Sequence, residues 1–263
     1  MTRSVRSVVT VLLAGILTAW CALASSALGN GVPTTCNGYV PTITGSGLIN
    51  GTEGNDVIMG SPSADTILAF GGNDIVCALG NNDVVVGGLG SDYIDGGPGG
   101  DLLTGDTFTT NSTASGGGSD TIRGGDDPDN IVGDNRVNGT GNASGGGNDT
   151  IYADGGDDII VIGDNFAQFG TASGTTNDVI HGGAGQDDLL IGDNNTHTGT
   201  ATGFGSDQIY GDEGDGDELI GDNFSQNIGG TGTTSGGGND LCDGGPGTAD
   251  TANAACNLIQ NVP

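Results

Sequence analysis

Residues 87–104 read GGLGSDYID followed by GGPGGDLLT, which are two consecutive units of nine residues. The same register continues towards the N-terminus through ALGNNDVVV (78–86), AFGGNDIVC (69–77), GSPSADTIL (60–68) and GTEGNDVIM (51–59). The sixth residue of every unit is aspartate, namely Asp56, Asp65, Asp74, Asp83, Asp92 and Asp101. The eighth is aliphatic, namely Ile58, Ile67, Val76, Val85, Ile94 and Leu103. One carboxylate, one inward apolar side chain and a glycine-rich turn in each fixed period predict a calcium-loaded parallel β-solenoid.

The composition sets a problem that this fold must solve. The chain of 263 residues has 33 acidic residues, four basic residues and 56 glycines, and its formal net charge is −29. A surface of this sign repels nucleic acid and anionic membranes, so neither is expected as a partner. The same charge opposes a compact state, and ordering so many glycines adds an entropic cost. The periodicity therefore predicts a folded chain only if something neutralises the aspartates.

A hard divalent cation would meet this requirement. Ca²⁺ accepts several carboxylate and carbonyl oxygens in flexible geometry, and it loses its water more readily than Mg²⁺. Zinc prefers Cys and His, and neither residue type is frequent in the repeat turns. We therefore expect several Ca²⁺ ions in the turns, and folding that is coupled to the metal.

The N-terminal stretch predicts export. Arg3 and Arg6 precede an apolar run that ends in small residues with an A-x-A cleavage site. Residues 1–27 are accordingly predicted to be a secretory signal peptide, with cleavage after Ala24 or Ala27, and a signal anchor is the alternative. No later segment is apolar enough to span a bilayer. We expect the mature chain to be extracellular.

Three units match the pattern G-G-x-G-x-D-x-U-x, in which U is a large apolar residue, at every defined position: 87–95, 96–104 and GGAGQDDLL at 182–190. They resemble the RTX, or haemolysin-type, calcium-binding repeats, and the resemblance covers about residues 51–248. It implies an all-β fold, a right-handed parallel β-roll in which two nonapeptides form one coil. It also implies that Ca²⁺ lies between the turns of successive coils, held by Asp carboxylates and by carbonyl groups of the glycine turns.

The resemblance also assigns candidate calcium ligands. The carboxylates are those of Asp56, Asp74, Asp83, Asp92, Asp101, Asp120, Asp129, Asp149, Asp158, Asp178, Asp187, Asp207 and Asp240. The glycine candidates are Gly87, Gly88, Gly90, Gly96, Gly97, Gly99, Gly182, Gly183 and Gly185. The turns that contain Asp65 and Asp83 lack most of the glycines, so we expect them to bind weakly or to serve as an N-terminal cap.

After residue 104 the nonapeptides alternate with longer units. Each opens with Gly-Asp, at Asp106, Asp134, Asp164, Asp193 and Asp222, and the spacings are 28, 30, 29 and 29 residues. A coil of 18 residues with an excursion of 10–12 residues explains these spacings. We expect the excursions to stack on one side of the roll as a comb of loops.

The excursions are rich in Thr, Ser, Asn and Gly, and several phenylalanines lie in or beside them. These are Phe108, Phe166, Phe169, Phe204 and Phe224. The rings allow two interpretations: a ligand-contacting surface, for example for carbohydrate, or packing that anchors the loops to the coils. We favour the second interpretation.

Four cysteines remain after the predicted signal peptide: Cys36, Cys77, Cys242 and Cys256. An even number in an exported chain indicates disulfides, with three connectivities to choose from. We expect Cys36–Cys77 and Cys242–Cys256, because each pair lies at one end of the solenoid and terminal coils need caps. The predicted segments are the signal peptide, an N-terminal cap (28–50), nonapeptides (51–104), loop-bearing repeats (105–243) and a C-terminal cap (244–263).

The sequence offers no constellation that is typical of catalysis. His181 and His197 have no Ser, Cys or Asp partner at a spacing typical of a nucleophile–base pair. No segment outside the repeats is long enough to form a catalytic domain. We therefore expect a secreted, non-enzymatic calcium-binding protein with a structural or surface role. The alternative is a Ca²⁺-dependent adhesin or glycan-binding module that uses the comb of loops.

Overall fold

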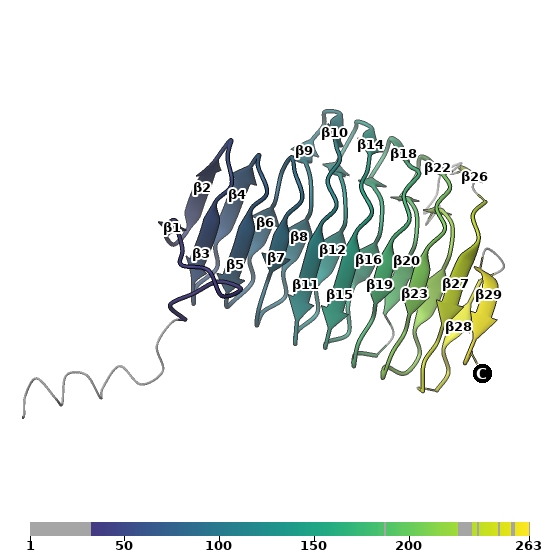
Figure 1. Ribbon diagram of the computed structural model, residues 1–263. Helices are drawn as coiled ribbons and strands as arrows, with labels where there is room; N and C mark the ends of the chain where they lie inside the picture. Colours follow the sequence, from purple (N-terminus) through teal and green to yellow (C-terminus); the bar gives the residue numbers. More distant parts are fainter. Residues whose placement is uncertain are drawn as a thin grey trace, which may run out of the picture. The chain divides into compact units, whose positions relative to one another are not determined.

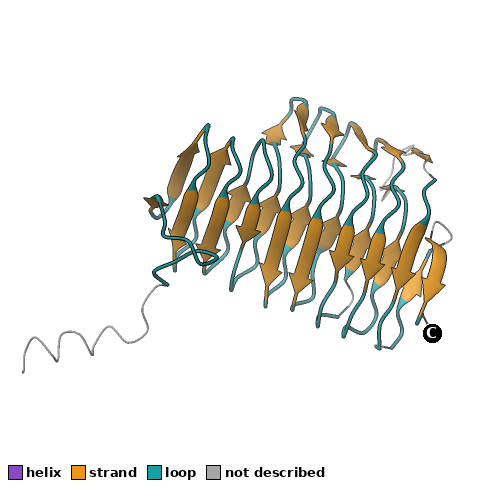
Figure 2. Cartoon of the chain, in the orientation of Figure 1, coloured by secondary structure: helices purple, strands orange, loops and turns teal. Residues whose placement is uncertain are grey.

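The computed structural model describes residues 33–186, 188–225, 233–235, 237–246, 248–253 and 256–262. Residues 35–263 form one compact unit. The described residues contain 29 strands and no helix (Figure 2). Among them no helix is therefore available that could cross a membrane. The predicted signal peptide and Asp187 lie outside the described residues.

Two large parallel sheets form the roll, and successive nonapeptides contribute strands to them alternately (Figure 1). The first main sheet has the order β1 (Ile43–Thr44), β3 (Val57–Ser61), β5 (Ile75–Leu79), β7 (Tyr93–Asp95), β11 (Thr121–Gly125), β15 (Thr150–Asp154), β19 (Val179–His181), β23 (Gln208–Tyr210), β27 (Asp240–Asp243) and β29 (Cys256–Gln260). The second has the order β2 (Leu48–Thr52), β4 (Thr66–Phe70), β6 (Val84–Val86), β8 (Leu102–Thr104), β12 (Asn130–Val132), β16 (Ile160–Ile162), β20 (Leu189–Ile191), β24 (Glu218–Ile220) and β28 (Thr251–Ala252). This arrangement confirms the predicted all-β roll.

The aliphatic residue at the eighth position of each repeat fills the space between these two sheets. In the first main sheet Ile94 is in register with Ile122, and Ile122 with Ile151. All three side chains are fully buried, and so are Ile131 and Leu103 of the second main sheet. Because side chains alternate along a strand, each strand places one large aliphatic group inside and its neighbours outside. The core is thus one continuous stack that grows with every repeat.

The excursions lie on one side of the roll, as expected, but they are strands rather than loops (Figure 1). The first excursion sheet has the order β10 (Ala114–Gly116), β14 (Ala143–Gly145), β18 (Thr171–Gly174), β22 (Thr200–Gly203) and β26 (Thr233–Ser235). The second has the order β25 (Phe224–Ser225), β21 (Asn195–Thr196), β17 (Phe166–Ala167), β13 (Arg136–Asn138) and β9 (Phe108–Thr110). Each excursion therefore extends its coil instead of projecting from it.

Small side chains form the core of this added layer. Ala114, Ala143 and Ala172 are in register in the first excursion sheet, and all are fully buried. Val137 and Ala167 of the second sheet complete the cluster. Alanine brings the two sheets close together, and because the buried groups are small the hydrophobic pattern that would predict strands is weak.

The phenylalanines divide into two groups. Phe166 and Phe224 pack against a buried aliphatic cluster that includes Ile162. The guanidinium carbon of the buried Arg136 lies 5.5 Å from the centre of the Phe166 ring. These contacts match the packing interpretation. By contrast, the side chain of Phe204 is 61% exposed.

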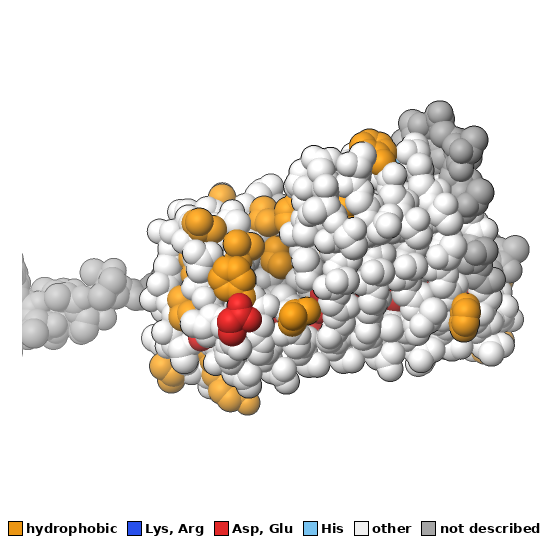
Figure 3. Space-filling model, turned by 90° about the horizontal axis from the view of Figure 1, so that it is seen from above, with side chains coloured by type: hydrophobic (Ala, Val, Ile, Leu, Met, Phe, Trp, Pro, Cys, Tyr) orange, Lys and Arg blue, Asp and Glu red, His pale blue; other side chains and the backbone are white. Residues whose placement is uncertain are grey.

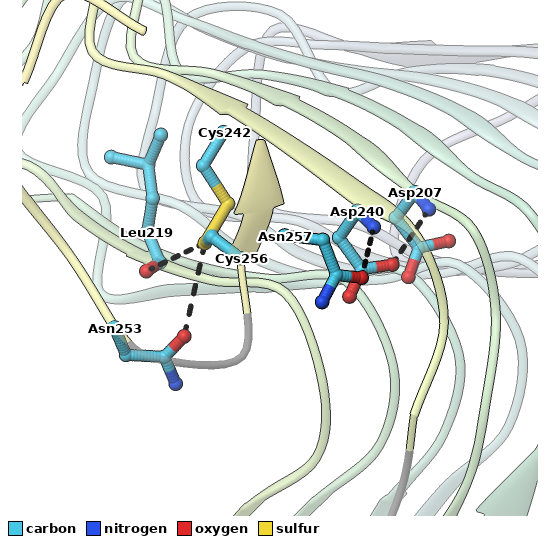
Figure 4. The surroundings of a disulfide bond; sticks show 7 residues. All are labelled: Asp207, Leu219, Asp240, Cys242, Asn253, Cys256 and Asn257. Atoms are coloured by element: carbon cyan, nitrogen blue, oxygen red, sulfur yellow. Dashed lines mark hydrogen bonds between the residues drawn. A yellow bond between two sulfur atoms is a disulfide. The ribbon is translucent and has the colours of Figure 1, made fainter. Parts of the chain in front are cut away.

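Disulfides close both ends of the roll with the predicted connectivity. Cys36 is bonded to Cys77 on β5, and Cys242 on β27 is bonded to Cys256 on β29. Figure 4 shows the second bond beside the last coils of the roll. The strand after the last repeat is thus attached covalently to the strand that it covers.

Candidate calcium-binding turns

The repeat aspartates form two ladders that run along the roll. In each ladder one carboxylate oxygen, Oδ1, accepts a hydrogen bond from the backbone N–H of the aspartate one coil earlier, for example Asp74 N to Asp92 Oδ1 at 2.8 Å. The first ladder contains Asp56, Asp74, Asp92, Asp120, Asp149, Asp178, Asp207 and Asp240. The second contains Asp65, Asp83, Asp101, Asp129, Asp158, Asp188, Asp217 and Asp250.

The other carboxylate oxygen, Oδ2, is buried without a hydrogen-bond donor in most members of both ladders. These members are Asp74, Asp83, Asp92, Asp101, Asp120, Asp129, Asp149, Asp158, Asp207, Asp240 and Asp250. A buried carboxylate oxygen without a partner is costly, and so many in regular rows indicate a group that the protein atoms do not supply. A cation is the partner that carboxylates in this setting require.

In most turns a glycine at the first position leaves the space into which Oδ2 points, whereas Ala69, Ala78 and Ala153 occupy this position before Asp74, Asp83 and Asp158. A Cβ placed on Gly87 would lie 2.5 Å from Asp92 Oδ2 and 2.4 Å from the carbonyl oxygen of Gly105. A Cβ placed on Gly96 would lie 2.3 Å from Asp101 Oδ2. Carboxylate and carbonyl oxygens therefore border a space that glycine leaves open in these turns. This donor set suits a hard cation such as Ca²⁺.

At Gly88 the backbone requires the second glycine of the turn, although Phe70 and Leu79 hold the same position with positive φ in earlier turns. Gly88 has a φ of 106°, and a Cβ there would lie 1.8 Å from the carbonyl oxygen of Phe70 in the preceding coil. Glycine tolerates both the positive φ and the close approach. The glycines of the turn thus set the spacing between coils as well as the shape of the site.

Burial disfavours the ionised form of the carboxylates in the metal-free ladders. Desolvation raises the pKa of Asp92 to about 7 and that of Asp101 to about 8, although hydrogen bonds from the backbone partly oppose the rise. The pKa of Asp120 rises to about 9, again because of burial. A bound divalent cation would reverse this preference, since opposite charge favours the ionised carboxylate.

The two most N-terminal ladder members differ from the rest. Thr52 donates from its N–H and its hydroxyl to Asp56 Oδ2, both at 2.8 Å. Ser61 N–H donates to Asp65 Oδ2 at 2.7 Å. Their carboxylates are thus satisfied within their own turns, which makes Asp56 a weaker ligand candidate than the sequence pattern indicates. By contrast, Asp83, which was expected to bind weakly, has a buried Oδ2 without a donor.

Strict nine-residue counting misplaces or misses members of the second ladder. In the turn at 182–190 the ladder aspartate is Asp188, and the fully buried core residue is Leu190 rather than Leu189. Asp217 and Asp250 continue the ladder and were not among the predicted ligands. These turns contain one additional residue before the aspartate, such as Gly216, so a ten-residue template would have found them.

The two histidines lie away from the ladders. His181 stacks between Tyr152 and Tyr210, with ring centres 5.0 and 4.8 Å apart. Its Nδ1 is 2.9 Å from Asp212 Oδ2, a carboxylate partner that sequence spacing did not reveal. Within the described ranges no three His, Cys, Asp or Glu side chains gather at a point where they could hold a metal ion. A cation in the turns would therefore take further oxygens from backbone carbonyls or water.

Comparison with known families agrees with this geometry. The model of the RTX calcium-binding nonapeptide repeat matches the chain in four copies, over residues 50–85, 78–108, 143–164 and 173–195. No curated protein and no solved structure matches the chain.

Proposed function

This chain is an RTX calcium-binding nonapeptide-repeat protein, and from that premise we propose that it is an extracellular structural protein whose roll folds as Ca²⁺ binds to its turns. The observation that carries the proposal is the pair of ladders with buried, donor-free Oδ2 atoms, most of which face space that a turn glycine leaves open. The aspartates of both ladders and the carbonyl groups of the turn glycines would hold the ions. Bound Ca²⁺ would supply positive charge that cancels the repulsion along each ladder.

The coupling to folding follows from this charge balance. Without metal, the folded chain must either bury ionised carboxylates or keep them protonated, and both options disfavour the fold at neutral pH. With metal, binding energy is gained only by the folded chain, because the ladders bring their oxygens together only in successive coils. An extracellular location would provide millimolar Ca²⁺, which suits weak extracellular sites. Support for that location comes from the leader-like residues 1–27.

The test is a Ca²⁺ titration of the mature protein followed by far-UV circular dichroism, with Mg²⁺ and EGTA as controls. We expect a cooperative gain of β signal with Ca²⁺ that EGTA reverses. A full β signal in EGTA would show that the core and the disulfides suffice, and would contradict metal-coupled folding.

A matched pair of variants connects the response to the ladders. Asp149 is fully buried, and its Oδ2 has no donor, whereas Asp126 is exposed in a turn. Asp149→Asn should move the Ca²⁺ midpoint up by about tenfold or more, since a charged ligand contributes roughly 1.5–3 kcal/mol. Asp126→Asn removes the same charge and should leave the midpoint nearly unchanged. Equal shifts in both variants would indicate a general charge effect rather than ladder sites.

A second candidate function, glycan binding by the excursion side, is favoured by one surface feature. A groove of about 870 Å³ is lined by Ser, Thr and Gly residues of the first excursion sheet and by the exposed Phe204. From above, the described part of this side shows few charged side chains (Figure 3). Phe204→Ala should abolish a glycan-array signal of the Ca²⁺-loaded protein, while the packed Phe166 is unsuitable for this test. Absence of any array signal from the unmodified protein would reject this candidate.

A further inference from the structure

The Gly-Asp pairs that open the long units form a third row of aspartates. Asp106, Asp134 and Asp164 are fully buried, and Asp193 is 1% exposed. Asp222 is partly buried. Each is followed by Thr107 or by an asparagine, and the asparagine side chains form their own ladder, with Asn135 Nδ2 donating to Asn165 Oδ1 at 3.0 Å. The row therefore lies inside the added layer, where water has little access.

Each aspartate of this third row follows a glycine that lies against a first-ladder carboxylate of the same coil. A Cβ on Gly105, which immediately precedes Asp106, would lie 2.3 Å from Asp120 Oδ2. The corresponding distances are 2.4 Å from Gly133 to Asp149 Oδ2, 2.5 Å from Gly163 to Asp178 Oδ2 and 2.5 Å from Gly192 to Asp207 Oδ2. Burial, followed by the charge of Asp207, raises the pKa of Asp193 to about 9. The long coils therefore bring two buried carboxylates together where the short coils have one.

Three of these pairs contain oxygens for which the described residues supply no donor. Both carboxylate oxygens of Asp106 are buried without a partner, as are Asp134 Oδ2 and Asp193 Oδ1. Their neighbours Asp120, Asp149 and Asp207 each have a donor-free Oδ2. Two adjacent buried carboxylates that lack donors repel each other unless a proton or a cation is shared between them.

The Asp164 and Asp178 pair is the exception, and its difference is informative. The Thr176 hydroxyl contacts Asp164 Oδ1 and lies 3.3 Å from Asp178 Oδ2, so it bridges the two carboxylates. Asn194 Nδ2 donates to Asp164 Oδ2 at 3.0 Å, as Asn223 Nδ2 does to Asp193 Oδ2 at 3.4 Å, so the hydroxyl is the difference between these two coils. In the neighbouring coils the position of Thr176 is occupied by Gly147 and Gly205, which have no side chain to place there. A hydroxyl fills the gap in one coil, and the gap stays open in the others.

We propose that the pairs Asp106/Asp120, Asp134/Asp149 and Asp193/Asp207 each bind a divalent cation at a two-carboxylate site, and that the Thr176 hydroxyl replaces the cation between Asp164 and Asp178. This inference rests on the proposed function and deepens it, because it separates a class of doubly charged sites from the single-carboxylate turns of residues 51–104. Ca²⁺ is the cation that oxygen donors of this kind select, and a second carboxylate increases affinity.

The groove on the excursion side borders part of the third row. It is lined by Gly146, Gly174 and Thr176 among others. A Cβ on Gly146 would lie 2.6 Å from Asp134 Oδ2, and one on Gly174 would lie 2.6 Å from Asp164 Oδ2. The two glycines of the groove thus lie directly against third-row carboxylates.

The experiment counts Ca²⁺ ions bound to the full mature chain, by equilibrium dialysis and atomic absorption, in three variants, at a free Ca²⁺ concentration that fills the two-carboxylate sites and leaves the single-carboxylate turns empty. Asp193→Asn breaks an open pair and should lower the count by about one, since the neutral amide cannot complete a doubly charged site. Asp164→Asn makes the same substitution in the bridged coil and should leave the count unchanged. Thr176→Gly opens the gap and should raise the count by about one. Equal counts for Asp193→Asn and Asp164→Asn, or no gain for Thr176→Gly, would overturn the inference.

A second measurement excludes loss of folding as the cause. At saturating Ca²⁺, Asp193→Asn should give the same far-UV β signal as the unmodified protein, because the remaining sites and the continuous core still hold the roll together. A reduced β signal would ascribe the lower count to loss of folding and would overturn the inference. If the unmodified chain binds no Ca²⁺, the proposed function itself fails. If it binds several ions and the count of Asp193→Asn is unchanged, only the two-carboxylate sites are rejected.

Discussion

The nonapeptide region, residues 51–104, and the long-coil region, residues 105–243, share one core but differ in how many carboxylates each coil buries. In the first region each coil is two strands and two turns, and each turn has one ladder carboxylate. In the second region the excursions add two sheets, an asparagine ladder and a third row of aspartates. The comparison shows that a solenoid can widen its coil while keeping its register, provided that the inserted segment also repeats from coil to coil.

Widening the coil increases the electrostatic cost of burying its carboxylates. In the nonapeptide region burial raises the pKa of Asp74 and Asp83 to about 6, that of Asp92 to about 7 and that of Asp101 to about 8. It raises the pKa of Asp120 and Asp193 to about 9 in the long coils, where neighbouring carboxylates add to the effect. The long coils therefore depend more strongly on a counter-ion than the short ones do.

The largest expected effect is the pH dependence of the metal-free protein. A carboxyl whose pKa is raised by folding stabilises the fold below its unfolded value, near 4, and this stability is lost as the pH rises through the folded pKa. In EGTA, hydrogen-exchange protection of residues 51–104 should fall up to about pH 8, and that of residues 105–243 should continue to fall to about pH 9. Saturating Ca²⁺ should reverse the trend, because the ions need ionised carboxylates. Identical pH profiles for the two regions would remove the electrostatic distinction.

The disulfides give the next largest effect and compare the two ends of the roll. Cys36–Cys77 has a sequence separation of 41 residues, and Cys242–Cys256 has one of 14. Replacing both cysteines of a pair with serine should therefore lower the free energy of unfolding by about 4 kcal/mol at the N-terminal end and about 3 kcal/mol at the C-terminal end. Denaturant unfolding of the Ca²⁺-loaded protein measures both values. A larger loss at the C-terminal end would mean that strand packing, rather than loop closure, governs capping.

A matched pair of core substitutions asks whether the two layers of a long coil unfold together. Ile151 lies in the main core and Ile162 in the cluster beneath the excursions, and both are fully buried. Each Ile→Ala substitution should cost roughly 2–5 kcal/mol, with a single unfolding transition in both variants. A separate early transition in Ile162→Ala, seen by calorimetry, would show that the added layer is an independent unit.

The smallest predicted effect concerns the asparagine ladder. The Asn165 side chain is fully buried, and its Nδ2 donates to the Gly145 carbonyl at 2.9 Å. Asn165→Ala should cost about 1–3 kcal/mol, because its buried partners lose their hydrogen bonds. The exposed Asn177 accepts one hydrogen bond from Ser206 N–H, so Asn177→Ala should cost less, about 0.5 kcal/mol. Similar losses for both, measured by urea unfolding, would show that the buried ladder has no special stabilising role.

The roll, its inward residues and both disulfides could be predicted from the sequence, because each depends on the repeat period or on the position of the ends. The strands of the excursions could not, since their core is mainly alanine, whose small side chain gives little hydrophobic contrast. The third carboxylate row was visible as Gly-Asp spacing, but its burial became evident only when the inserted segments proved to be sheets.

Single additional residues explain the remaining errors. Gly216 lengthens its turn, so a nine-residue count overlooks Asp217, and at 182–190 the same count selects Asp187 instead of Asp188. The partner of His181 was equally hidden, because Asp212 is 31 residues away in sequence and adjacent only after one full coil. Such contacts depend on the exact length of each coil, which the local pattern does not encode.

The ladders also give the molecule a direction. Every ladder N–H donates to a carboxylate one coil later in the chain, and the row ends where Asp240 N–H donates to Asn257 Oδ1 at 3.1 Å (Figure 4). A neutral amide thus closes a sequence of charged acceptors. Because each ladder N–H needs an acceptor from the following coil, a roll that folds from its N-terminal end always has an unpaired donor in its last folded coil. Only the final strand removes that unpaired donor.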